Sequence, residues 1–354
     1  MGKLLILNPR MDVSDPHFTF ITKWVNALAA YFDQIDVVTE LEGEIDVAQN
    51  VAVYSSEIED ETGTLSPYAG LDLVVRSLVK QERYEACFAH MAPDLLAAVG
   101  YRIKEAGIPI VFWYADVKDS ESVRESVELA NYVVSSVASA VPVQTDKLKV
   151  IGQGIDTNLF YPRHTLPTRP YPLIVHTGRL NPIKNQDKII KAVEKINVDV
   201  ILIGESTPLD PPEYREELEK MIFEYDVVHR VRMIGAVDMA DVVAWNQQAT
   251  LGINLTPEGS FDKAALEQMS CGIPTLVSNS AFAPIIKGFE NYLYLEDPED
   301  IEGLAKKIQD LLRLPIAQRV FFGRVLRNRV NEAHNFKQLI ERLVEIIRHG
   351  DGGE

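Results

Sequence analysis

Two cations stand close together after an apolar run in the second half of the chain. The run Leu173 to Thr177 has the composition of a buried strand, and Arg179 and Lys184 follow it just before a helical pattern. Gly178, directly after the run, permits a tight turn. Two cations beside a helix N-terminus suit a diphosphate, because arginine offers a bidentate fork, lysine a point charge and the helix a favourable dipole. A solvated loop with two ordinary surface cations fits this segment equally well.

A second polar segment links two further apolar runs. Residues 251–278 read as a strand, a polar loop, a short helix and a strand, which is the unit that holds an anion at the carboxyl end of a parallel sheet. Glu267 stands one turn into this helix and could accept hydrogen bonds from both hydroxyls of a ribose. Leu266 and Met269 would form the core side of the helix, so Glu267 is placed beside the buried face.

The loop before this helix offers further groups to an anion. Gly259 and Ser260 let backbone amides approach a phosphate or a sugar, and Lys263 could reach the same anion from the start of the helix. The competing interpretation is that Asp262 or Ser260 only caps the helix and that Glu267 lies on a wet face. We favour the binding role.

Polar side chains also follow apolar runs in the first half of the chain. His90 ends one run and Asp116 follows the next, so both would lie at the carboxyl ends of strands. An imidazole or a carboxylate there could orient or deprotonate an acceptor hydroxyl, although a lone histidine after a strand is more often a hydrogen-bonded structural residue. Asp12 and His17 have the same location after the run Lys3 to Asn8, and we assign them to acceptor binding.

Short apolar runs alternate with helical patterns along most of the chain, which predicts parallel sheets covered on both faces. A length of 354 residues favours roughly two domains. The proline-rich stretch 161–172 predicts a linker between a first domain over 1–160 and a second over 173–330, with a disordered tail over 349–354. Two doubly wound domains would meet at a cleft, with ligands outside the carboxyl ends of the strands.

The charge balance limits the partners. Lysine and arginine total 35 against 52 aspartate and glutamate residues, which gives a net charge of −17. This balance argues against a nucleic-acid partner and weakens any binding to anionic lipid through charge alone. Five arginines between residues 313 and 329 form a local exception. We interpret them as a solvated helix face, with peripheral membrane contact as the alternative.

Two cysteines and the N-terminal residues indicate the compartment. Cys87 and Cys271 lie in apolar surroundings, which predicts reduced core thiols rather than a disulfide. The apolar run at the N-terminus is too short for a signal peptide or a membrane span. We therefore expect a cytoplasmic protein, with peripheral contact at the inner face of the membrane as an option.

No metal or other cofactor is predicted. The sequence contains no Asp-x-Asp triplet, no cysteine and histidine set with zinc spacing, and no G-x-x-x-x-G-K-[ST] phosphate loop. A diphosphate held without a metal needs fixed cations and helix dipoles, which Arg179, Lys184 and the helix after Ser260 would supply.

From about residue 84 to 280 the chain resembles family 4 glycosyltransferases of the two-Rossmann GT-B fold. VIGQGIDTNLFYPR resembles the segment that closes the first domain in that family, and VHTGRLNPIKNQDKIIKAV resembles its phosphate-binding strand, loop and helix. SFDKAALEQMSCGIPTLVS resembles its donor-binding loop and helix. The GAV at 235–237 falls where the family's backbone meets the nucleobase. The resemblance and the residue patterns together give the donor-binding set Gly178, Arg179, Lys184, Gly235, Val237, Gly259, Ser260, Phe261, Asp262, Lys263 and Glu267.

The resemblance implies retaining transfer of a sugar from a UDP- or GDP-linked donor to a hydroxyl group of a glycan, a lipid or a small metabolite, without a required metal. A donor phosphate oxygen would take the acceptor proton. It also implies a C-terminal helix, over 331–348, that packs back on the first domain. His90 matches a family position beside the donor sugar, and with Asp116 and Glu258 it forms the catalytic set.

The sequence departs from the family pattern after the first strand, where the usual glycine pair is missing, and also around Glu258 and Asp116. Many members have two glutamates with seven residues between them, whereas Glu258 and Glu267 have eight, and Gly259 stands at the expected position. Either the loop bulges, or a backbone amide and Asp262 replace the first carboxylate. Relatives with this loop type often show histidine where Asp116 stands. A non-catalytic nucleotide-sugar-binding scaffold and an epimerase or phosphorylase of the same fold are therefore competing functions.

Overall fold

The computed structural model describes most of the chain as two compact units. The first comprises Met1–Gly152 and Lys337–Glu354, and the second comprises Gln153–Phe336. The stretch 161–172, which we expected to be a linker, lies inside the second unit. His17 and Ser260 lie outside the described residues, which are 2–15, 19–59, 65–66, 70–165, 168–208, 210–259 and 261–350.

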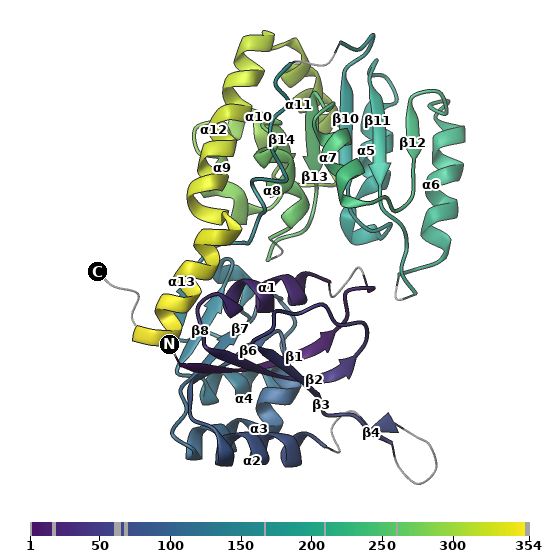
Figure 1. The fold of residues 1–354 in the computed structure, drawn as a ribbon. Coiled ribbons are helices and arrows are strands. Elements are labelled where there is room, and N and C mark those ends of the chain that lie inside the picture. The colour runs from purple at the N-terminus through teal and green to yellow at the C-terminus, as the bar shows by residue number, and fades with distance from the viewer. Residues whose placement is uncertain are drawn as a thin grey trace. The chain divides into compact units, whose positions relative to one another are not determined.

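The first unit contains a parallel seven-stranded sheet with the strand order β3-β2-β1-β6-β7-β8-β9. The strands Tyr84–His90, Ile110–Trp113 and Tyr132–Ser135 are mostly buried apolar runs, as strands covered on both faces require. In Figure 1, helices α2, α3 and α4 lie on one face of this sheet and α1 lies on the other. The strands are β1 (Lys3–Met11), β2 (Gln34–Glu42), β3 (Val51–Ser55), β6 (Tyr84–His90), β7 (Ile110–Trp113), β8 (Tyr132–Ser135) and β9 (Leu148–Val150), and the short pair β4 (Ile58–Glu59) and β5 (Leu65–Ser66) lies apart.

The helices of the first unit come from both ends of the sequence. The final helix, α13 (Phe336–His349), belongs to this unit, where Arg348 forms a hydrogen bond with the carbonyl of Tyr31 and lies 3.8 Å from the carboxylate of Glu85. The helix expected over 331–348 is divided in two. Asn335 has an extended backbone, so α12 ends at His334 and α13 begins at Phe336. The other helices are α1 (Thr19–Ala29), α2 (Leu71–Gln81), α3 (Pro93–Glu105), α4 (Glu121–Leu129) and the single turn η1 (Ala138–Ala140).

The second unit contains a parallel five-stranded sheet with the order β12-β11-β10-β13-β14. In both units the strand order reverses beside the first strand, which is the doubly wound arrangement. The prediction of two doubly wound α/β domains is confirmed. The strands are β10 (Leu173–Thr177), β11 (Asp199–Ile203), β12 (Val231–Met233), β13 (Leu251–Asn254) and β14 (Thr275–Val277), and the helices are η2 (Pro182–Lys184), α5 (Gln186–Val193), α6 (Glu213–Glu224), α7 (Met239–Asn246), α8 (Lys263–Ser270), η3 (Ser280–Phe282), α9 (Ala283–Ile286), α10 (Glu290–Leu293), α11 (Ile301–Arg313) and α12 (Ile316–His334).

Most of the basic stretch 313–329 supports the fold of the second unit. Arg319 donates to carbonyls that end α11, and Arg329 donates to carbonyls around the end of α9. Arg327 donates to the carbonyl of Phe160 at 2.8 Å and to that of Ser270 at the end of α8. Helix ends leave such carbonyls without intrahelical partners. Three of the five guanidinium groups therefore act as caps rather than as a purely solvated face.

Both cysteines are free and buried, as expected from their apolar surroundings. Burial raises the pKa of the Cys87 thiol above its ordinary range and raises that of Cys271 to about 12. Among the described helices, none combines the length and the apolar character needed to cross a bilayer.

Candidate functional site

The strand order of the second unit reverses between β10 and β13, which pair in parallel. Loops that leave neighbouring strands at such a switch point diverge to opposite faces of the sheet, and ligands of doubly wound folds bind in the gap between them. The loop after β10 carries Arg179 and Lys184, and the loop after β13 carries residues 258–262. The two polar segments singled out in the sequence therefore meet at one place.

Lys184 and Asp262 form the central contact of this place. The Lys184 Nζ lies 2.6 Å from Asp262 Oδ2, and both side chains are largely buried. Asp262 Oδ1 accepts a hydrogen bond from the amide of Ala264 and so caps α8, while Oδ2 also accepts from Asn254. Burial pushes the pKa of Asp262 up, but the charge of Lys184 and these hydrogen bonds outweigh burial and lower it. Asp262 thus places a carboxylate at the N-terminus of α8, where it competes with an anionic ligand for the helix dipole and for Lys184.

Arg179 is held by a buried carboxylate that the sequence did not reveal. Its Nη1 lies 3.2 Å from Asp210 Oδ1, and Asp210 is almost fully buried whereas Arg179 is half-exposed. Burial raises the pKa of Asp210, but hydrogen bonds from Asn181 and Thr207, together with the charge of Arg179, lower it overall. Asp210 follows β11, the strand beside β10. Arg179 is therefore oriented from a neighbouring loop and keeps part of its guanidinium accessible.

Three glycines line the carboxyl ends of adjacent strands. Gly178 donates to the carbonyl of Ile203, and Gly204 donates to the carbonyl of Gly235, both at 2.9 Å. Gly204 has φ +133°, and a Cβ there would lie 2.1 Å from the Gly178 carbonyl oxygen. Only glycine adopts this φ without strain and has no Cβ that would clash with the Gly178 carbonyl. These contacts fix the loops after β10, β11 and β12 to one another, close to Val237, which is partly buried.

His176, near the end of β10, lies next to Gly178, and the sequence patterns did not point to it. Its ring is completely buried, and Nδ1 donates to the Ile253 carbonyl at 3.0 Å. Among the described residues no group forms a hydrogen bond with Nε2, which a Cβ at Gly178 would approach to 3.3 Å. Burial lowers the pKa of His176 from 6.5 to about 4, and the charge of Lys184 acts in the same direction. The imidazole is therefore uncharged at neutral pH, next to the loop that carries Arg179 and Lys184.

We expect His176→Asn to reduce the acid sensitivity of the second unit. Because the folded-state pKa of His176 is depressed, its contribution to stability is present above pH 6.5 and is lost as the pH falls through about 4. The loss is roughly 3 kcal/mol over this window. Asparagine keeps an amide donor for Ile253 but cannot ionise. Melting temperatures measured from pH 7.5 to 4 should fall less steeply in the variant, although the variant starts lower.

The matched control for this measurement is His229→Asn, because His229 is exposed. Its melting curve should follow that of the wild type at every pH. A slope for His176→Asn that is as steep as that of the wild type would contradict the assignment.

Two side chains of the loop after β13 contact the turn that follows β14: Glu258, which is exposed, and Phe261, which is buried. Glu258 accepts from the amide of Ser280 at 2.7 Å and from its hydroxyl at 2.5 Å, which ties the loop to the turn after β14. Phe261 is buried against Phe282, with ring centroids 4.9 Å apart. Gly259 has φ +81°. Glu258 and Phe261 therefore fix the conformation of the loop. The backbone near Gly259 is the part of the loop that remains to contact a ligand.

Lys263 and Glu267 stand four residues apart on α8, which places them on one face of the helix. Both side chains are partly buried. Leu266 and Met269 are buried, as the predicted core side requires. Glu267 thus has the intermediate position that the sequence indicated.

In the first unit, His90 is packed among aromatic rings. It is buried, and its ring stacks on Trp24 with centroids 4.5 Å apart and meets Phe20 edge-on at 5.8 Å. Asp116 is exposed and accepts from the amide of Lys118 within its own turn. His90 ends β6, which pairs with β1 where this sheet reverses.

Asp12 follows the apolar part of β1 and is engaged within its own loop. The Ser14 hydroxyl donates to Oδ1 at 2.7 Å and Arg10 donates to Oδ2 at 2.9 Å. The Ser14 hydroxyl, with Arg10 and the amides of Ser14 and Glu44, lowers the pKa of Asp12 to about 2. The carboxylate therefore stiffens this loop. Across the parts of the chain that the structure describes, no group of three or more histidine, cysteine, aspartate or glutamate side chains could hold a metal ion.

Residues 162–329 match the family model of glycosyl transferases group 1. A GDP-mannose-dependent monoacylated α-(1-6)-phosphatidylinositol monomannoside mannosyltransferase of Corynebacterium glutamicum is 26% identical over 191 residues. That match covers 50% of this chain and 47% of the relative, so the chain spans about half the length of this relative. The matched range contains Arg179, Lys184 and Glu267.

Solved structures share the fold of the whole chain. The Anabaena protein HepE, in complex with UDP and glucose, has a TM-score of 0.76 at 18% identity and covers 99% of this chain and 100% of its own. Sucrose-phosphate synthase from Thermosynechococcus elongatus has a TM-score of 0.75 at 18% identity, with 98% of each chain covered. The fold is therefore the GT-B fold.

Proposed function

We propose that the chain is a retaining glycosyltransferase, which moves a sugar from a UDP- or GDP-linked donor to a hydroxyl group of an acceptor without a required metal ion. The observation that carries this proposal is the contact of Lys184 with Asp262, the N-cap residue of α8, at the switch point, with Arg179 on the same loop as Lys184. The match of residues 162–329 to glycosyl transferases group 1 supports the same class of reaction. The similar proteins include one named for GDP-mannose and one solved with UDP.

In this reaction the bond between the anomeric carbon and the diphosphate breaks, and the acceptor oxygen forms the new bond on the same face. The acceptor proton passes to the departing phosphate oxygen, so no strong protein base is needed. Arg179, Lys184 and the dipole of α8 would stabilise the charge on the departing diphosphate. Glu267 would hold the ribose, and the backbone at 235–237 would contact the base.

We assign the acceptor to the first unit, at its own switch point between β1 and β6. His90, Asp116 and the loop of Asp12 lie at the carboxyl ends of the strands there. A glycan, a lipid-linked sugar or a small hydroxyl compound would suit these polar groups. The aromatic packing of His90 would position the imidazole rather than leave it mobile.

Calorimetric titration with UDP, GDP and ADP in the presence of a chelator tests the donor. Binding of one diphosphate, followed by faster release of that diphosphate from its sugar conjugate when acceptors are added, would support transfer. Binding without release would favour the scaffold, and interconversion of the donor sugar would favour an epimerase. A folded wild type that binds no diphosphate would remove the basis of the proposal.

Asp262→Asn is expected to tighten diphosphate binding by roughly tenfold, or about 1.4 kcal/mol. The substitution removes the negative charge that lies 2.6 Å from the Lys184 ammonium, and asparagine caps a helix as well as aspartate does. The free protein should melt at a lower temperature because Lys184 loses its partner. Titration and thermal melting of the same sample would measure both effects.

The control is Asp300→Asn, which changes the same charge at the N-cap of α11. It should leave diphosphate affinity unchanged. If Asp262→Asn binds diphosphate no more tightly than the wild type, Lys184 is not the cation that holds it.

A further inference from the structure

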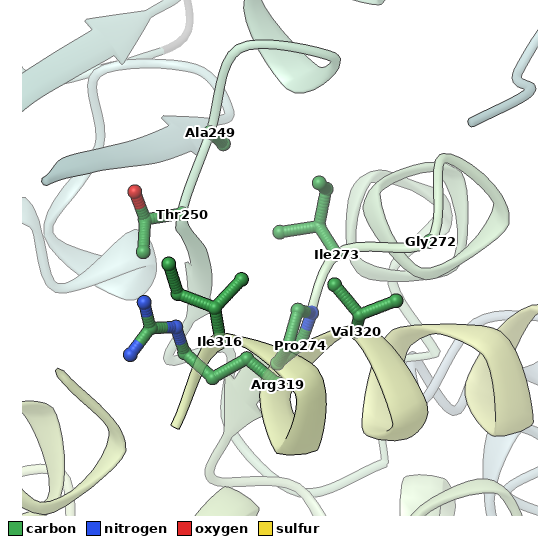
Figure 2. A pocket seen from close by; sticks show the side chains of 8 residues that line it. All are labelled: Ala249, Thr250, Gly272, Ile273, Pro274, Ile316, Arg319 and Val320. Atoms are coloured by element: carbon green, nitrogen blue, oxygen red, sulfur yellow. The ribbon is translucent and has the colours of Figure 1, made fainter. Parts of the chain in front are cut away.

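Two adjoining hollows lie at the amino-terminal end of the second unit's sheet, opposite the end that carries Lys184. Ala249, Gly272, Ile273 and Val320 line both of them. Ala249 precedes β13 and Ile273 precedes β14, which fixes the hollows at the starts of these strands. The smaller has a volume of about 140 Å³ and the larger about 310 Å³. In Figure 2, which shows the smaller hollow, Ile316 and Val320 project from α12 toward Ile273.

The larger hollow concentrates positive charge in an acidic protein. Its lining includes Arg163, Arg324 and Arg327 but no aspartate or glutamate, although the chain carries a net charge of −17. Arg163 and Arg324 are exposed, and neither forms an ion pair within the described part of the chain. The other lining residues are uncharged and mostly apolar. The hollow therefore combines an apolar floor with an unneutralised cationic rim.

Arg327, which also lines the larger hollow, adds a third positive charge to it. Its guanidinium donates to the carbonyls of Phe160 at 2.8 Å and Thr157 at 3.3 Å. Carbonyls satisfy its hydrogen bonds but leave its charge unpaired. Burial lowers the pKa of Arg327, which reflects the cost of keeping a cation away from water. An anion in the hollow would offset part of this cost.

We propose that the larger hollow binds a compact organic anion, made of an apolar body and one phosphate or carboxylate head. Arg163 and Arg324 take the head, and Ile273 and Val320 take the body. The volume of about 310 Å³ lies at the small end of ligand pockets, which range from roughly 300 to 1,000 Å³ and pair an apolar lining with a few polar anchors. This site goes beyond the proposed transfer reaction and does not depend on it.

Calorimetric titration of the full chain with 1-naphthyl phosphate tests this site, with inorganic phosphate and 1-naphthol as the separated head and body. We expect one naphthyl phosphate to bind, and each separated part to bind at least tenfold more weakly. Arg163→Ala combined with Arg324→Ala should weaken naphthyl phosphate binding at least tenfold. Val320→Glu should weaken it as well, because it adds a carboxylate to the wall that the two hollows share.

Arg76→Ala combined with Arg83→Ala is the matched control, since it removes two exposed arginines from the first unit. It should leave binding unchanged. No binding to the wild type, or full binding to both Arg163→Ala with Arg324→Ala and Val320→Glu, would overturn the proposal. Binding that is lost in Arg179→Ala with Lys184→Ala but kept in Arg163→Ala with Arg324→Ala would place the probe at the switch point and overturn it too.

Discussion

Replacing Arg179 and Lys184 together by alanine is expected to weaken the binding of a nucleoside diphosphate by at least a hundredfold. Each cation would form charge-assisted hydrogen bonds with the diphosphate, worth about 1.5 to 3 kcal/mol. The lower end applies here, because both cations already have carboxylate partners in the free protein and must share them with the ligand. Two contributions of about 1.5 kcal/mol correspond to a factor of more than 100. Calorimetric titration in chelator measures this difference.

The control removes two other lysines of the same unit, Lys220 and Lys306, which are exposed and paired within their own helices. Their replacement by alanine should leave affinity unchanged. Removing Lys184 also leaves Asp262 largely buried without its partner, so the double variant should melt earlier and is titrated well below its melting temperature. An affinity equal to that of the wild type in a folded double variant would contradict the donor site.

The strands could be predicted because sheets buried on both faces need apolar runs, and each run ends where polar residues begin. That rule placed Lys184 and Asp262 on loops after strand ends, and the structure shows that these strands are neighbours and brings the two side chains within 2.6 Å. It also placed His90 at the end of β6. Local composition is sufficient for such positions, since the carboxyl ends of parallel strands lie at one edge of a sheet.

Other features depend on contacts between distant segments and leave no local signal. Asp210 and His176 acquire their roles from Arg179 and Ile253, which lie far from them in sequence. A carboxylate after a strand end, such as Asp210, could have been found by extending the strand-end rule to β11. The buried His176, inside an apolar run, carried no such sign.

Contacts between distant segments also determine the structure of the stretch 161–172 and of the basic stretch 313–329. Prolines at 161–172 indicated a linker, but Arg169 there lies 3.3 Å from the carboxylate of Asp199, and the carbonyl of Tyr161 accepts from Gln247. Composition reports backbone stiffness and not such tertiary hydrogen bonds. The sequence favours a solvated face for the arginines of 313–329, because the carbonyl partners of Arg319, Arg327 and Arg329 lie in other elements of the unit.

Gly323→Ala is expected to lower the stability of the second unit by roughly 3 kcal/mol or more, which is at the upper end of the cost of overpacking a core. A Cβ at this position of α12 would lie 1.8 Å from the carbonyl oxygen of Gly272. Neither the Gly272 turn nor α12 can move away at a low energetic cost. The Gly272 amide donates a hydrogen bond to the carbonyl of Met269, and next to Gly323 the buried Phe322 stacks on Phe289 with ring centroids 4.3 Å apart.

Differential scanning calorimetry should show the melting transition of the second unit about 6 to 12 °C lower in this variant, since 1 kcal/mol shifts a unit of this size by roughly 2 to 4 °C. Gly100→Ala is the matched control, because Gly100 is also a helical glycine, on α3 of the first unit. Its Cβ would meet the flexible end of Leu129 rather than backbone, so the gain in helix propensity should leave that variant near the wild type. Equal melting temperatures for Gly323→Ala and the wild type would mean that α12 does not pack against the Gly272 turn in solution. The larger hollow, which both segments line, would then lose part of its wall.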